Sequence, residues 1–130
     1  MYRWVEHTGE LELHVEAESP TGVFAEALQA FAELVGDGPA GEPARYEIEL
    51  EAADQATLLA EWLGELVYLA ETQGLVPERV AGFDLEGTRL RATVEGRLGQ
   101  PPHLVKAVTY HGLELVREGE GWGARVVLDV

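Results

Sequence analysis

The sequence contains no cysteine, which excludes disulfide bonds and thiolate metal sites. It contains a single serine, Ser19, which is better placed to cap a helix than to act as a nucleophile. No apolar run approaches the roughly 18 residues of a membrane span. The N-terminus also lacks the basic and apolar segments of a signal peptide. We therefore expect a soluble cytoplasmic protein that does not use serine or cysteine catalysis.

Positive charge is scarce as well. The chain has 24 acidic and 9 basic residues, with a formal net charge of −15. Because nucleic acids attract proteins through lysine and arginine, we do not expect this chain to bind RNA or DNA by itself. An acidic surface instead favours basic protein partners and hard cations. The same charge could serve only solubility, or suit a hot or salty habitat, and composition alone leaves these alternatives open.

Common catalytic and nucleotide-binding motifs are also absent. The chain has no G-x-x-x-x-G-K-[ST] or G-x-G-x-x-G phosphate loop and no G-x-S-x-G nucleophile elbow. Four histidines occur without the spacing of a zinc site: His7, His14, His103 and His111. We interpret them as surface or hydrogen-bonded structural residues.

The hydrophobic pattern predicts one α+β domain over residues 1–130. Apolar residues at helical spacing predict helices after Ser19 and after Asp54, the second ending at Gly74. Trp62, within the second helix, is expected in the core. Alternating and short apolar segments predict strands over 2–7, 10–16, 45–51, 79–85, 89–96, 106–110, 113–118 and 123–130. The simplest arrangement is a two-layer fold: an antiparallel sheet of about seven strands with both helices packed on one face.

Four segments together resemble the archease family. HTGEL (His7–Leu11) is similar to the family's His-Thr-Ala-Asp-Ile signature, and DQATLLAEWLGELVYL (Asp54–Leu69) to its Asp-x-x-x-Leu-Leu-x-x-Trp-Leu-x-Glu-Leu-x-Tyr-Leu helix. VKAVTYHGLEL (Val105–Leu115) matches its Lys-Ala-Val-Thr-Tyr-His element. ARVVLDV (Ala124–Val130) resembles its closing strand, which carries an aspartate. The four matches keep the family's order from the first strand to the last residue.

This resemblance implies a small α+β domain built on a strand–helix–strand–strand unit, and it implies a function. Archeases are chaperone-like accessory proteins of the RtcB-type RNA-splicing ligase. That enzyme joins RNA ends carrying 2′,3′-cyclic phosphate or 3′-phosphate to 5′-hydroxyl ends, using GTP and a divalent metal. The archease promotes guanylylation of the ligase and its multiple turnover. We therefore expect a non-catalytic activator in tRNA splicing or RNA repair that meets RNA only through the ligase. An acidic helper also suits an enzyme with a basic RNA groove.

By position in these motifs, the resemblance maps the family's functional groups to Glu10, Asp54, Lys106 and Asp129. It further implies a metal site formed by Glu10, Asp129 and the main-chain oxygen of Val130. Calcium, magnesium and manganese are the hard cations that such oxygens bind. Since Val130 is the last residue printed, a terminal carboxylate could add charge there. The family has aspartate where this chain has Glu10, so the longer side chain must fold back to reach an ion at about 2.0–2.6 Å.

Each of these residues also has a simpler interpretation. Lys106 is the only lysine, which argues that its position tolerates no guanidinium, but an arginine-rich coding bias would leave the same pattern. Asp54 could cap the second helix, alone or in addition to another role. Asp129 should be exposed if Val126, Leu128 and Val130, on the other face of its strand, point into the core, and any surface aspartate would be exposed in the same way. Glu10 could be a solvated residue on the polar face of its strand.

Two other functions remain open at this stage. One is a stand-alone metal-dependent enzyme that uses the same acidic residues and Lys106, although the chain lacks a nucleotide-binding loop. The other is an acidic decoy that occupies a basic RNA-binding groove and inhibits its owner. The metal, the RNA substrate of the partner and the oligomeric state do not follow from the sequence.

Overall fold

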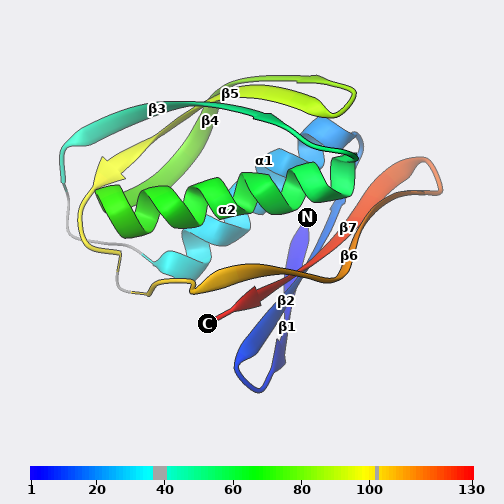
Figure 1. Ribbon diagram of the computed structural model, residues 1–130, viewed down its shortest axis with the longest axis horizontal. Coiled ribbons are helices and arrows are strands. Elements are labelled where there is room, and N and C mark those ends of the chain that lie inside the picture. The colour runs from blue at the N-terminus through cyan, green and yellow to red at the C-terminus, as the bar shows by residue number, and fades with distance from the viewer. Residues whose placement is uncertain (37–40, 102) are drawn as a thin grey trace.

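The computed structural model describes residues 1–36, 41–101 and 103–130 (Figure 1). Within them it contains two helices and seven strands, which confirms the α+β class. In chain order the elements are β1 (Tyr2–His7), β2 (Glu10–Ala17), α1 (Pro20–Val35), β3 (Pro43–Glu51), α2 (Gln55–Gln73), β4 (Leu75–Glu86), β5 (Arg89–Leu98), β6 (Ala107–Glu118) and β7 (Gly121–Asp129).

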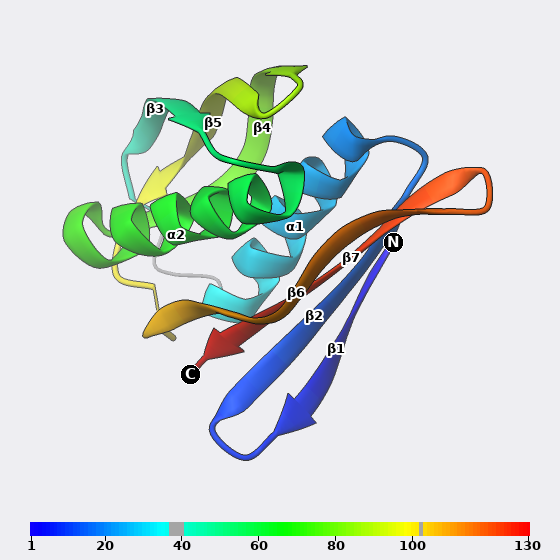
Figure 2. The same ribbon diagram turned by 45° about the vertical axis from the view of Figure 1, so that its right-hand side comes forward.

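The strands form two antiparallel sheets rather than the single sheet expected from the sequence. One has four strands in the order β1-β2-β7-β6, and the other has three in the order β3-β5-β4. The two helices lie between the sheets, α1 against β2 and β4, and α2 against β6, β3 and β4 (Figures 1 and 2). Helix α2 buries nine residues over a wide surface, so it can cover more than one sheet.

Both helices begin at the predicted caps. Ser19 Oγ accepts a hydrogen bond from the main-chain N–H of Gly22 at 3.1 Å, and Pro20 follows at the first helical position. Asp54 Oδ1 accepts one from the N–H of Thr57 at 2.7 Å. Helix α2 ends at Gly74, whose φ of 71° is the left-handed conformation that glycine adopts without strain.

The core is centred on aromatic rings between the helices and β4. The Trp62 ring lies 6.3 Å from that of Phe24 and 5.7 Å from that of Phe83. The Trp62 indole donates a hydrogen bond to the main-chain oxygen of Phe24 at 3.0 Å, so its one polar atom is satisfied. The prediction that Trp62 is a core residue is confirmed.

β6 is a single strand where the sequence predicts two. Its register against β7 changes from Thr109 opposite Val127 to Glu114 opposite Arg125, so residues 110–113 form a β-bulge. The bulge interrupts the alternation of apolar and polar residues, which is why the sequence suggests two short strands. β4 is longer than predicted for the same reason, because irregularities between Pro77 and Gly82 break its alternation.

Each sheet turns one face toward the helices and leaves the other uncovered by them (Figure 2). In β2, Leu13 and Val15 are buried on the helix side, whereas Glu12 and His14 lie partly exposed on the open face. In the part of the chain that the structure describes, neither helix is long and apolar enough to cross a membrane.

Candidate functional site

A row of residues crosses the four-stranded sheet at the end of β7. The strand register pairs His7 with Glu10, Glu10 with Asp129, and Asp129 with Ala107. Residues directly opposite on neighbouring antiparallel strands share one face, with their Cβ atoms about 5 Å apart. Glu10 and Asp129 are therefore adjacent carboxylates on the open face, although 118 residues separate them in the chain (positions 11 to 128).

Lys106 joins this row through the main chain. Its N–H donates a hydrogen bond to the main-chain oxygen of Asp129 at 2.8 Å, and the N–H of Val130 donates to Gly9 at 3.3 Å. Side chains alternate along a strand, so Lys106, next to Ala107, begins on the helix side of the sheet rather than on the carboxylate side. The structure thus gathers Glu10, Lys106, Asp129 and Val130 at one end of the sheet.

The charged groups of this sheet end are not paired with one another. Among the described residues, none of Glu10, Lys106 and Asp129 makes an ion pair or a side-chain hydrogen bond. Lys106 is exposed, whereas Asp129 is only partly exposed, which corrects the expectation of full exposure. The reason is that β7 is an inner strand, between β2 and β6, where neighbouring side chains crowd the open face: Val127, on the same face as Asp129, is only 8% exposed.

Asp54 lies elsewhere in the fold. The main-chain N–H of Ala52 donates to Thr88 at 3.1 Å, and Gln55 Nε2 donates to Gly87 at 2.8 Å, so α2 starts beside the β4–β5 turn. In both views the start of α2 is well apart from the end of β7 (Figures 1 and 2). The hydrogen bond from the Thr57 N–H holds the pKa of Asp54 below its usual value. Asp54 is therefore a helix cap outside the Glu10–Asp129 row.

Next to the Glu10–Asp129 row, Glu12 forms the centre of a hydrogen-bonded cluster that the sequence did not predict. Glu12 Oε2 lies 3.0 Å from His7 Nε2, and Glu12 Oε1 lies 3.0 Å from His14 Nε2 and 3.4 Å from Arg125 Nε. The hydrogen bond with His7 lowers the pKa of Glu12, and His14 and Arg125 add to the effect. The alternation of ELELHVE places Glu10, Glu12 and His14 on one face. The contributions of His7 and Arg125 depend on strand pairing, which the sequence does not reveal.

The oxygen donors at the sheet end are of the kind that hard cations prefer. Glu10 and Asp129 supply two neighbouring carboxylates, which are common ligands of Ca²⁺, Mg²⁺ and Mn²⁺. Within residues 1–36, 41–101 and 103–130, no group of three or more His, Cys, Asp or Glu side chains could hold a metal ion. Any ion here would take its other ligands from main-chain oxygens or water, which fits these cations and not a structural zinc.

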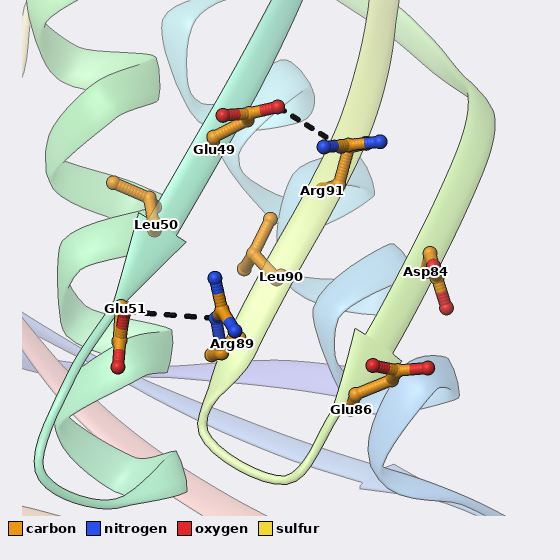
Figure 3. Close-up of a pocket in the computed structure, with 8 residues that line it drawn as sticks. All are labelled: Glu49, Leu50, Glu51, Asp84, Glu86, Arg89, Leu90 and Arg91. Atoms are coloured by element: carbon orange, nitrogen blue, oxygen red, sulfur yellow. Dashed lines mark ion pairs between the residues drawn. The ribbon is translucent and has the colours of Figure 1, made fainter.

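The pocket drawn in Figure 3 lies on the other sheet. It encloses about 400 Å³ and is lined by Glu49, Leu50, Glu51, Asp84, Glu86, Arg89, Leu90 and Arg91. Its arginines face carboxylates across the strands: Arg91 Nε lies 2.9 Å from Glu49, and Arg89 Nε lies 3.6 Å from Glu51. None of the residues predicted to be functional lines this pocket, and its cationic groups already have partners.

Known proteins match this chain over nearly its whole length. Residues 2–130 match the Archease protein family. The archease of Methanopyrus kandleri is 33% identical over 97% of this chain and 96% of its own length, and that of Methanosarcina barkeri is 32% identical over 99% and 95%.

Two solved structures share the fold. The solution structure of Methanobacterium thermoautotrophicum protein 1598 has a TM-score of 0.75 and 28% identity, and covers 99% of this chain and 98% of its own. A crystal structure from Thermotoga maritima, described as an archease and possible chaperone, has a TM-score of 0.69 at 24% identity, with 100% and 98% covered. From the first strand to the last residue, this chain belongs to the archease family.

Proposed function

We propose that this protein is a non-catalytic accessory factor that promotes the guanylylation and repeated turnover of an RtcB-type RNA ligase in tRNA splicing or RNA repair. Membership of the archease family supports an accessory role, as does the description of the Thermotoga maritima relative as a possible chaperone. The finer assignment to an RNA ligase comes from the family resemblance of the four motifs.

The observation that carries the proposal is the unpaired charge at the end of the four-stranded sheet. Glu10 and Asp129 are register partners, and the Lys106 main chain is bonded to Asp129. These groups make no ion pair with other described residues, so they remain free to act on another molecule. A lysine and two carboxylates without internal partners are suited to assist a reaction between a nucleoside triphosphate and a protein side chain that needs a divalent metal.

Each residue then has a defined task. Glu10 and Asp129, together with the main-chain oxygen of Val130, would hold the divalent cation. When bound, such an ion neutralises charge on phosphate oxygens. Lys106 offers a compact ammonium to a phosphate or to a carboxylate of the partner. Asp54 supports the start of α2, and RNA is met only through the ligase, because a chain of net charge −15 repels a phosphate backbone.

The test is a guanylylation time course of the cognate ligase with GTP and Mn²⁺, with and without this protein. We expect the protein to raise the rate of guanylylation, and a substoichiometric amount to suffice for repeated RNA joining. Lys106→Arg should lose the stimulation, whereas Arg91→Lys, on the other sheet, should keep it. An unchanged rate with the wild-type protein would refute the proposal, and a lowered rate is what an acidic decoy predicts. Turnover of a small molecule by the isolated protein would indicate the stand-alone enzyme instead.

A further inference from the structure

The β-bulge of β6 is an unusual feature on an edge of the molecule. β6 is one of the two edge strands of the four-stranded sheet, and its bulge sets residues 110–113 opposite the single β7 position Val126. Gly112 has a φ of 68°, a conformation that other residues rarely adopt. Bulges re-aim side chains and end regular pairing, and they are frequent at sheet edges and next to functional sites.

Specific contacts fix the shape of this bulge. Arg125 Nε donates a hydrogen bond to the main-chain oxygen of Gly112 at 3.0 Å, and the same nitrogen lies 3.4 Å from Glu12 Oε1. A Cβ atom on Gly112 would lie 2.9 Å from Arg125 Nη2, so the two residues are in close contact. The bulge is therefore held by the neighbouring strands rather than being a loose loop.

The segment around Lys106 presents large apolar side chains to solvent. Tyr110, in the bulge, is 58% exposed, and Leu104 is 52% exposed. They are two of six large hydrophobic residues that the described chain exposes, and they flank Lys106 in sequence. At about 3.3 Å per residue, Tyr110 lies within about 13 Å of Lys106 along the strand. Single exposed apolar residues are ordinary, but tyrosine beside a proposed site is a typical anchor of protein interfaces.

Carboxylates lie around these two side chains, together with the Lys106 ammonium and with Arg125, which contacts the bulge. Glu114 follows the bulge and is exposed, and Glu10 and Asp129 lie at the adjoining end of the sheet. The whole chain carries a net charge of −15. A chain this acidic favours a basic protein surface as its partner, because complementary charge brings partners together and like charge keeps them apart.

We propose that Leu104 and the bulge at residues 110–113 form a docking surface for a basic protein surface with an apolar pocket that receives Tyr110. This inference rests on the proposed function, in which the partner is the RNA ligase. The docking surface supplies affinity, whereas Lys106 and the two carboxylates act on the reaction. The two contributions are separable because the anchors are apolar and the site is charged.

The experiment measures the affinity of the ligase for wild-type protein and for Tyr110→Ala and Leu104→Ala, at low and at moderate salt. The matched control is Tyr68→Ala, because Tyr68 is 57% exposed but lies on α2. We expect Tyr110→Ala to weaken binding at least 10-fold and Tyr68→Ala to change it less than twofold. Wild-type binding should weaken as salt rises. A higher concentration of Tyr110→Ala should restore the guanylylation rate of the ligase. Lys106→Arg should bind the ligase without stimulating its guanylylation.

A second pair of variants tests the bulge itself. Gly112→Ala strains the bulge and crowds Arg125, whereas Gly87→Ala imposes similar strain at a φ of 59°, in open space at the β4–β5 turn. Of these two variants, Gly112→Ala should weaken ligase binding and Gly87→Ala should not. Unchanged binding by Tyr110→Ala, or equal losses from Tyr68→Ala, would overturn the docking surface while ligase stimulation by the wild type stands. A wild-type protein that neither binds nor stimulates the ligase would overturn both proposals.

Discussion

The arginines of the three-stranded sheet and the charged residues at the β7 end of the four-stranded sheet differ in whether they have internal partners. On the three-stranded sheet, arginines of β5 face carboxylates of β3, and Glu95 lies within ion-pair distance of both Arg45 and Arg79. At the end of the four-stranded sheet, the carboxylates of Glu10 and Asp129 and the Lys106 ammonium have no such partners among the described residues.

This difference shows that a cavity and a functional site need not coincide. The three-stranded sheet has the pocket, but the two arginines that line it are already paired with Glu49 and Glu51 (Figure 3). Exposed ion pairs contribute little to stability, and charged residues on a small sheet chiefly keep it soluble and unable to pair with other chains. The end of the four-stranded sheet has unsatisfied charge, which a ligand or partner can use.

The largest effect is expected from removing one unpaired carboxylate. Asp129→Asn keeps the shape of the side chain but removes the charge next to Glu10, so it should reduce ligase guanylylation at least 10-fold. Asp84→Asn makes the same change on the other sheet and should leave the rate within twofold. The measurement is the initial rate of guanylylation at saturating protein. If both variants reduced the guanylylation rate equally, the carboxylates of the two sheets would not differ in function.

A smaller effect is expected from shortening Glu10. Glu10→Asp introduces the aspartate of the His-Thr-Ala-Asp-Ile signature that this segment resembles. The shorter side chain does not need to fold back to reach an ion. We expect Ca²⁺ or Mn²⁺ to bind a few-fold more tightly by calorimetry, because less side-chain freedom is lost on binding. Glu86→Asp, on the three-stranded sheet, serves as the control. Weaker binding by Glu10→Asp would mean that this chain's site is built around the longer side chain.

Asp54 provides an example of a carboxylate whose partner is internal. Because its pKa is lowered in the folded protein, its contribution to stability is present above the pKa of the unfolded chain, near 4. That contribution is lost as pH falls through the lower folded-state pKa. Asp54→Ala should therefore lower the thermal unfolding midpoint at pH 7, and the difference from wild type should shrink below pH 4. A difference that stays constant down to pH 2 would show that the carboxylate charge does not strengthen the cap.

The smallest effect is expected from breaking the ion pair between Glu49 and Arg91 on the three-stranded sheet. A double-mutant cycle of Glu49→Ala and Arg91→Ala should give a coupling energy below about 1 kcal/mol, which added salt should reduce. Thermal or denaturant unfolding measures it. A coupling above about 2 kcal/mol would make this face a structural element rather than a solvated one.

Local features of the fold were predictable from the sequence, and long-range ones were not. Ser19, Asp54 and Gly74 mark helix ends through contacts within a few residues, so their roles could be read directly. The division into two sheets depends on pairing between distant strands, such as β2 with β7, which alternation does not specify.

The candidate site shows the same limit. The family motifs named Glu10, Lys106 and Asp129, and alternation placed the carboxylates on a polar face. Only the strand register shows that Glu10 and Asp129 are neighbours, and only the contacts between the start of α2 and the β4–β5 turn show that Asp54 stands apart. The bulge that carries Tyr110 was hidden because its extra residues break the periodicity on which sequence interpretation relies.

The most direct test of this account is a Mn²⁺ titration of the ¹⁵N-labelled protein followed by amide line broadening, which reports where the ion sits independently of any ligase. We predict that the amides of Glu10, Ala107 and Asp129 broaden first, because they lie in one row across the sheet. Earlier broadening at Asp84 and Glu86, or uniform broadening over both sheets, would contradict the claim that the unpaired carboxylates form the site.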